Sequence, residues 1–231
     1  ITATPVSIAT YDTDVGEIRT ITLSDGSEIT LGAASAVSVT LAAQRRSVTL
    51  DRGEAFFAVS SDPSRPFAVQ VDQLTVTVVG TAFDVRRSAD VLRVAVAEGV
   101  VDVSQPFAIG DRATDINDNK RLRKGETVTA TVHDGISAIS AINPATVGNW
   151  RDGRLQYDGV SLAEVVADAN RYSKIPIQLE PLPPEVEGRL VRGVYRGNDV
   201  ENLLLSVAEL LPITIDRSDP GLIVIRSEPA D

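Results

Sequence analysis

The sequence predicts two domains of different fold class. Residues 1–143 are expected to form a mainly β domain, an irregular β-solenoid or sandwich of short strands. Residues 144–231 are expected to form a small α+β domain made of duplicated βαβ units. Three observations predict this division: helical periodicity is almost absent from the first part, glycine turns recur along it, and the last third contains the same small unit twice.

The first domain is expected to consist of short strands separated by glycine turns. The expected strands are residues 18–23, 28–31, 36–41, 47–50, 55–59, 65–71, 74–79, 80–85, 92–97 and 100–103, with a final hairpin at 121–132. The turn glycines are Gly26, Gly53, Gly80, Gly99 and Gly125. Their irregular spacing favours a sandwich or an irregular solenoid with about two strands per rung. Residues 109–119 are polar and are expected to form a loop, and residues 134–150 are expected to connect the domains.

The second domain contains two copies of a strand, a turn, an amphipathic helix and a second strand. The helical apolar stripes are Leu162, Val165, Val166, Ala169 and Tyr172 in the first copy, and Val200, Leu203, Leu204, Val207 and Leu210 in the second. Ser161 with Glu164 has the capping-box spacing, and Asn198 with Glu201 is a similar helix start. A last strand is expected at residues 222–225, so the order is βαβ and then βαββ. Neither copy can cover its helix alone, so the two are expected to pack together.

The bulk composition excludes several classes of protein. The formal net charge is −10 without a basic stripe, which argues against nucleic acid as a partner. Cysteine is absent, so disulfides, thiolate metal sites and a cysteine nucleophile are excluded. The chain has no apolar run long enough to span a membrane. Because it starts at Ile1 and contains no methionine, we expect it to be a piece of a longer protein.

The ionisable residues do not form a recognisable catalytic or metal-binding motif. His133 is the only histidine, and its neighbours Asp134-Gly135 favour a surface turn. Acidic residues beside turn glycines could in principle do glycosidase chemistry, but we expect them to be solvated turn residues; these are Asp25, Glu54, Glu98 and Glu126. Asp12, Asp14 and Glu17 lack the spacing of a calcium loop. We therefore expect no metal, no cofactor and no enzymatic activity on another molecule. The aromatic residues Phe56, Phe57, Phe67 and Phe83 are expected in the core.

An ordered series of motifs resembles a known family. The series is Gly16-Glu17, Leu23-Ser24-Asp25-Gly26-Ser27, Leu50-Asp51-Arg52-Gly53-Glu54-Ala55-Phe56-Phe57-Ala58-Val59, Arg65-Pro66-Phe67, Val79-Gly80-Thr81-Ala82-Phe83-Asp84-Val85 and Val96-Ala97-Glu98-Gly99-Val100-Val101. Over about residues 15–135 the chain resembles the periplasmic region of the FecR family of anti-sigma regulators. The duplicated unit resembles the secretin/TonB short N-terminal (STN) domain, which FecR-type proteins carry at their C-terminus.

This resemblance implies a role in cell-surface signalling. It implies the periplasmic region of a single-pass inner-membrane protein, whose anchor and sigma-binding cytoplasmic part are not in this chain. The implied partners are the N-terminal signalling domain of an outer-membrane TonB-dependent receptor, an extracytoplasmic-function (ECF) sigma factor, and periplasmic and intramembrane proteases. The pathway implied is regulation of iron–siderophore uptake.

Two places are candidates for functional residues. Some FecR-type proteins cleave themselves at a Gly-Thr bond, which corresponds here to Gly80-Thr81. A strained turn would favour this reaction, whereas the alternative is an ordinary turn or bulge. A partner strand could pair with an exposed sheet edge of the second domain, for which the candidates are Arg192, Val194 and Arg196, and Leu222, Ile223, Val224, Ile225 and Arg226. The alternative for these segments is an ordinary edge protected by arginine.

Two other functions remain open from the sequence. One is a receptor or secretin fragment that uses its short domain as an adaptor, although in those proteins this domain comes first and here it comes last. The other is a β-solenoid carbohydrate-active enzyme, which would need acidic residues converging on one strand face. The observed acids lie at turns instead.

Overall fold

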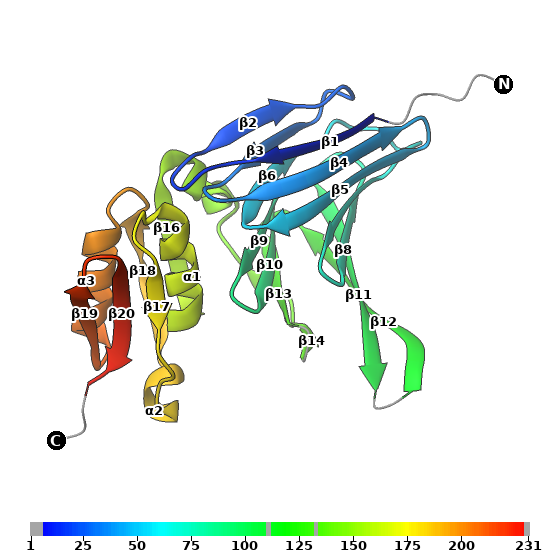
Figure 1. Ribbon diagram of the computed structural model, residues 1–231. Coiled ribbons are helices and arrows are strands. Elements are labelled where there is room, and N and C mark those ends of the chain that lie inside the picture. Colours follow the sequence, from blue (N-terminus) through cyan, green and yellow to red (C-terminus); the bar gives the residue numbers. More distant parts are fainter. Residues whose placement is uncertain (1–6, 110–111, 132–133, 229–231) are drawn as a thin grey trace. The chain divides into compact units, whose positions relative to one another are not determined.

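The computed structural model describes residues 7–109, 112–131 and 134–228 (Figure 1). The chain forms two compact units. The first unit comprises residues 1–148 and the second residues 149–231. The sequence places this boundary after residue 143, and the structure places it after Gly148. Each unit has its own fold.

The first unit is a sandwich of two sheets. Its strands are β1 (Ser7–Asp12), β2 (Arg19–Thr22), β3 (Glu28–Leu31), β4 (Ala36–Ala42), β5 (Arg45–Arg52), β6 (Glu54–Ala58), β7 (Phe67–Val71), β8 (Leu74–Val78), β9 (Ala82–Ser88), β10 (Val91–Glu98), β11 (Val100–Ile109), β12 (Arg112–Arg123), β13 (Glu126–Thr131), β14 (Gly135–Ile136) and β15 (Ser140–Ala141). One sheet has the order β1-β4-β5-β7-β8-β11-β12, and the other has the order β14-β13-β10-β9-β6-β3-β2, with β15 beside β13. The predicted mainly β class is confirmed.

The chain steps repeatedly from one sheet to the other, and glycines stand at these corners. Gly53 separates β5 from β6, Gly80 lies between β8 and β9, Gly99 separates β10 from β11, and Gly125 precedes β13. Gly26 differs, because it lies in the hairpin between β2 and β3 of a single sheet. The recurring glycines of the sequence therefore mark the edges of the sandwich, where the backbone must turn sharply.

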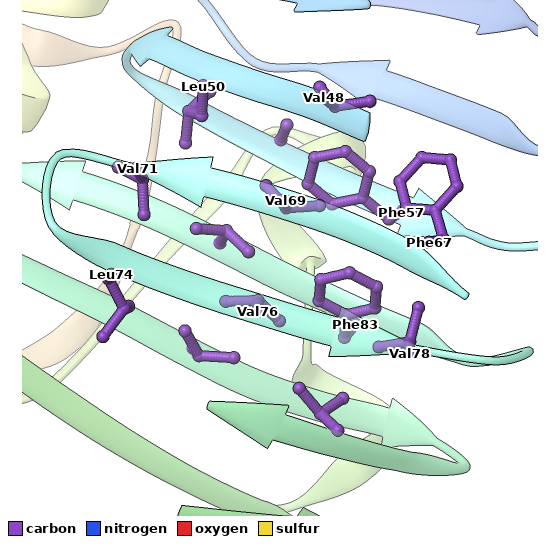
Figure 2. Close-up of a cluster of buried hydrophobic side chains, with 14 of the residues drawn as sticks. Val48, Leu50, Phe57, Phe67, Val69, Val71, Leu74, Val76, Val78 and Phe83 are labelled. Carbon is purple, nitrogen blue, oxygen red and sulfur yellow. The ribbon is translucent and has the colours of Figure 1, made fainter. Parts of the chain in front are cut away.

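The core lies between the two sheets and contains alternate residues of nearly every strand. Figure 2 shows the centre of this cluster, where the Phe57 and Phe83 rings stack with centroids 5.0 Å apart. Phe67 meets Phe57 edge-on at 6.2 Å. These three rings are fully buried and Phe56 is 6% exposed, so the prediction of core aromatics is confirmed.

Three parts of the first unit differ from the sequence prediction. The segment at residues 109–119 is expected to be a loop, but Ile109 ends β11 and residues 112–119 belong to β12, which pairs with β11 as a long hairpin. The predicted connector contains the short strands β14 and β15 and the 3₁₀ helix η1 (Pro144–Thr146). Strand β1 was not predicted, and it pairs with β4 along its whole length.

The second unit has the predicted order of strands and helices, with a 3₁₀ helix before it and one short α-helix between the two copies. Its elements are the 3₁₀ helix η2 (Asn149–Asp152), β16 (Arg154–Ser161), α1 (Leu162–Tyr172), β17 (Ile177–Leu179), α2 (Pro184–Glu187), β18 (Leu190–Arg196), α3 (Val200–Leu210), β19 (Ile213–Asp219) and β20 (Leu222–Ser227). Strands β16 and β18 form a two-stranded antiparallel ribbon. A separate three-stranded sheet has the order β17-β20-β19. Both α1 and α3 contact both of these sheets and each other, so the two copies share one core.

The helix starts follow the sequence in one copy and depart from it in the other. Ser161 and Glu164 form the predicted capping box. In α3 the N-cap is Asp199, whose carboxylate accepts the Asn202 N–H, and not Asn198. The predicted stripe of α3 is also shifted at its end, because Leu210 is 59% exposed and Leu211 is buried in its place. The physical reason is that the helix ends at Leu210, so the next residue turns extended and points inward.

Candidate partner-binding strand and the Gly80–Thr81 corner

One of the two predicted edge segments is not an edge. Strand β20 carries Leu222, Ile223, Val224, Ile225 and Arg226, and it is the central strand of its sheet. It pairs in parallel with β17 on one side and antiparallel with β19 on the other. Its backbone groups are therefore already used in the sheet, so a partner strand cannot pair with it. The prediction of a binding edge at residues 222–226 is wrong.

The charged end of this segment is also occupied within the unit. The Arg226 guanidinium donates to Glu180 at 2.9 Å and to Asp216 at 2.9 Å. Hydrogen bonding and charge from Glu180, with a smaller contribution from Asp216, raise the pKa of Arg226 above its usual value. The backbone N–H of Ser218 and the Arg226 charge in turn lower the pKa of Asp216. Arg226 is thus a cross-strand connector of the three-stranded sheet.

The other predicted segment does lie at an edge. Strand β18 pairs only with β16, so the side of β18 away from β16 is open. Along β18 the side chains alternate between an inward face with Val191 and Tyr195 and an outward face. The outward residues are Leu190, Arg192, Val194 and Arg196, all exposed. Leu190 is 54% exposed and Val194 is 64% exposed, which is high for apolar residues of a strand.

Charge is distributed unevenly over the outward face of the ribbon. Arg192 faces Asp158 across the strands and donates to it at 3.4 Å, with both side chains largely exposed. Arg196 is the register partner of Arg154, so two cations lie opposite each other. Within residues 7–109, 112–131 and 134–228, no acidic side chain forms an ion pair with either of these two arginines. One end of the ribbon is therefore basic in a chain of net charge −10.

Two glycines shape this ribbon. Gly159 has φ +75° at the bulge where the register of β16 shifts, and a Cβ there would lie 3.2 Å from the Arg192 guanidinium. Gly193 has φ +154°, and a Cβ there would lie 2.9 Å from the Tyr195 ring. The Tyr195 ring also lies 5.8 Å from the Tyr157 ring, on the inward face. The glycines thus let Arg192 and Tyr195 lie flat against the backbone on opposite faces.

Gly80 and Thr81 lie at the corner between β8 and β9, where Gly80 is exposed and Thr81 is buried, at 6% exposure. The Thr81 hydroxyl donates to the Val100 carbonyl at 3.0 Å, and the Thr81 carbonyl accepts the Val59 N–H at 3.0 Å. A Cβ at Gly80 would lie 2.7 Å from Ser61 Cα, so the close approach of this loop requires glycine. Gly80 is not among the residues with positive φ. The close approach to Ser61, and not a left-handed backbone, therefore explains why glycine stands at this position.

A buried arginine fixes the loop against which this corner packs. Arg46 is 1% exposed and forms an ion pair with Asp25 at 3.1 Å. Its guanidinium also donates to the carbonyls of Ser60 at 2.9 Å and Arg65 at 2.7 Å, and more weakly to that of Val79 at 3.5 Å. Its charge lies 5.6 Å from the centroid of the Phe67 ring. Arg46 therefore joins the loop at residues 60–65 to Val79, the residue just before the corner.

Asp25 is not the solvated turn residue that the sequence predicts. Its side chain is 5% exposed and accepts hydrogen bonds from the Ser27 backbone N–H and hydroxyl as well as from Arg46. Burial favours the neutral acid, but together the Ser27 and Arg46 hydrogen bonds outweigh it and lower the pKa of Asp25. Glu54 is also buried, at 4% exposure, whereas Glu98 is exposed.

The remaining candidates are the histidine and the acidic residues near the start of the chain. His133 lies outside the described residues. Among the residues that the structure describes, no group of three or more His, Cys, Asp or Glu side chains could hold a metal ion. Asp14 and Glu17 are instead joined locally, since the Asp14 N–H donates to the Glu17 carboxylate at 2.9 Å. Within the same described part of the chain, no helix has the length and apolar character needed to cross a membrane.

Sequence reasoning missed Arg46, although a signal for it was present. Arg46, Val48 and Leu50 share one face of β5 by the two-residue period of a strand, and Val48 and Leu50 are core residues. Because Arg46 is two residues before Val48 on the same strand, its side chain is expected to point inward. Its partners could not be inferred, because Asp25, Ser60 and Arg65 are distant in the sequence and meet it only in the folded sandwich.

Comparison with known proteins finds a family match within the first unit and a fold shared over most of the chain. A family model described as FecR protein matches residues 9–102. Two crystal structures of a candidate anti-sigma factor from Parabacteroides distasonis, at 2.50 and 1.65 Å resolution, are similar to this chain. Each has 24% sequence identity and a TM-score of 0.81, and covers 96% of this chain and 100% of its own. At this identity the likeness establishes a shared fold. No protein in the curated comparison matches.

Proposed function

Because the FecR family accounts for residues 9–102, we propose that this chain is the periplasmic signal-receiving region of a FecR-type anti-sigma regulator. The observation that carries the proposal is the FecR match together with the fold shared, over 96% of the chain, with a candidate anti-sigma factor. In this function the sigma factor is of the ECF class and is held by a cytoplasmic region outside this chain. Periplasmic and intramembrane proteases then release it.

The second unit is the proposed receiver of the signal. Its partner is the N-terminal signalling domain of an outer-membrane TonB-dependent receptor, in a pathway that regulates iron–siderophore uptake. The support is the resemblance of the duplicated unit to STN domains and the open edge of β18, which carries exposed apolar side chains. An open edge can accept a partner strand through backbone hydrogen bonds.

Calorimetric titration tests this proposal. The chain of residues 1–231 is titrated with purified N-terminal signalling domains of TonB-dependent receptors. We expect one of them to bind saturably, with a dissociation constant of about micromolar or lower. If every signalling domain of the source organism fails to bind the chain, and also fails to bind the membrane-anchored full-length regulator, the receptor proposal is refuted.

We also propose self-cleavage between Gly80 and Thr81. The Thr81 hydroxyl oxygen attacks the Gly80 carbonyl carbon, the peptide C–N bond breaks, and the hydroxyl proton passes to the departing amine. Water then hydrolyses the resulting ester. Two observations favour the proposal: Gly80 is exposed to water, and a Cβ at Gly99 would lie 3.0 Å from the Thr81 hydroxyl and 3.1 Å from the Gly80 carbonyl oxygen. The attacking group and the scissile carbonyl therefore face the same neighbour.

Mass spectrometry of the expressed protein tests the cleavage. We expect fragments that end at Gly80 and begin at Thr81, and we expect the same fragments from Thr81→Ser. Thr81→Val keeps the shape of the side chain but removes the nucleophile, so it should remain intact. Equal cleavage of Thr81→Val, or a wild-type protein that is never cleaved in cells, would exclude this chemistry.

A further inference from the structure

The outward face of β18 carries a pattern that specifies the sequence of a partner strand. We propose that β18 accepts, at its open edge, a partner strand in which apolar and acidic residues alternate on one face. The acidic residues would face Arg192 and Arg196, and the apolar residues would face Leu190 and Val194. This inference rests on the proposed receiver function of the second unit and adds the chemistry by which the partner is recognised.

Strand β18 differs from the other edge strands of the unit in the side chains that it exposes. Strand β16 has the polar residues Arg154, Gln156 and Asp158 on its outward face. Strand β17 has only three residues, and the exposed residues of β19 are polar or charged. Of the exposed large apolar residues that the structure describes in this unit, only Leu190 and Val194 lie on a strand. Exposed apolar side chains on an open edge promote association with other chains, which is harmful in a sheet that must stay free and useful in one that binds a partner.

Two arginines lie opposite each other at one end of the ribbon. Arg154 and Arg196 are register partners, so their Cβ atoms are about 5 Å apart. Like charges directly opposite each other on a sheet are unfavourable. A partner carboxylate beside the Arg196 guanidinium would reduce this repulsion, because arginine forms short charge-assisted hydrogen bonds to carboxylates. The two arginines are therefore expected to be more stable with a partner carboxylate bound than in the isolated ribbon.

The geometry of strand pairing determines which side chains of a partner would meet those of β18. In paired strands, side chains that lie opposite each other on one face are in contact. A strand added to β18 thus presents every second residue to the row Leu190, Arg192, Val194 and Arg196. Apolar residues are favoured opposite Leu190 and Val194, because their exposed surface is then covered. Acidic residues are favoured opposite the two arginines, and Arg192 can exchange its long, exposed bond to Asp158 for a partner carboxylate.

Display selection tests the recognition pattern and does not require the receptor to be identified first. Random seven-residue peptides, the length of β18, are displayed and selected on immobilised chain 1–231. We expect enrichment of peptides with apolar and acidic residues at alternate positions. Binding of the enriched peptides should fall about tenfold or more on Arg196→Glu and on Val194→Asp, because each replaces an attractive contact by a repulsive or desolvated one. These side chains are exposed, so the variants should fold.

A matched control separates this surface from general electrostatics. Lys174→Glu makes the same change in net charge at an exposed position of the same unit that lies outside the ribbon, and it should leave peptide binding within about twofold. Selection of a different pattern, no enrichment, or equal binding by Arg196→Glu and wild type would overturn the inference. The receptor proposal is judged separately by calorimetry: a receptor domain that binds wild type and Arg196→Glu equally well supports the receiver function and excludes this surface.

Discussion

Replacement of Arg46 by methionine should destabilise the first unit strongly. Methionine keeps most of the length and apolar volume of the side chain, so packing against Phe67 changes little. It removes the positive charge beside Asp25, whose side chain is 5% exposed. It also removes the donors for the Ser60 and Arg65 carbonyls, at 2.9 and 2.7 Å. The variant thus leaves a buried carboxylate without its cation.

The magnitude follows from the burial of the pair. Breaking a buried ion pair by removal of one partner costs about 3–5 kcal/mol of unfolding free energy. For a unit of this size each kcal/mol lowers the melting temperature by about 2–4 °C, so we expect a decrease of about 6–20 °C. Asp25→Asn should cost less, about 1.5–3 kcal/mol, because Arg46 keeps its carbonyl acceptors. The double variant should lose less than the sum of the two single losses, because a neutral amide at position 25 no longer needs a cation.

Urea unfolding followed by far-UV circular dichroism measures these losses. The single tryptophan, Trp150, lies in the second unit, so its fluorescence follows that unit separately. Arg45→Met is the matched control, since Arg45 is the exposed neighbour in β5 and its loss should change stability by less than about 0.5 kcal/mol. If Arg46→Met unfolds within about 1 kcal/mol of wild type, or if the double variant shows simple additivity, Arg46 does not act as a buried counterion.

Three further predictions concern local structure and pH. Gly53→Ala should lower the free energy of unfolding by more than about 2 kcal/mol, because Gly53 has φ +82° and a new Cβ would lie 2.8 Å from Ser35 Cα. Gly16→Ala is the control: Gly16 has φ +73° but no atom near a new Cβ, so the same urea assay should show a loss of about 1 kcal/mol. Asp199→Ala removes the N-cap of α3 and should lower the free energy of unfolding of the second unit by about 1 kcal/mol, measured by Trp150 fluorescence. An unchanged free energy would mean that another group caps the helix. The pKa of Asp25 is lower in the folded than in the unfolded state, so its stabilisation is present at neutral pH and is lost on acidification below about pH 4. Wild type should therefore lose more stability than Asp25→Asn between about pH 5 and pH 3, and parallel losses would contradict this assignment.

Local patterns in the sequence were sufficient for much of the architecture. The two-residue period of the strands, the corner glycines and the repeated helix stripe predict a β-rich unit followed by a βαβ–βαββ unit, and the structure has this order. The capping box of Ser161 and Glu164 was predictable because all of its atoms come from four consecutive residues. Such features depend on contacts between near neighbours in the chain, which the sequence displays directly.

Features that depend on pairing between distant segments were decided by the tertiary structure. Strands β18 and β20 both have alternating patterns with arginines, yet β18 is an edge and β20 is central, because β17 from the first copy pairs with β20 from the second. The side chain of Asp25 likewise reads as a turn residue until the fold brings Arg46 to it across 21 positions. A strand carries equal numbers of backbone donors and acceptors on both sides, so its sequence cannot reveal which sides are occupied. Only the folded arrangement determines that, and with it the edge that remains open to a partner.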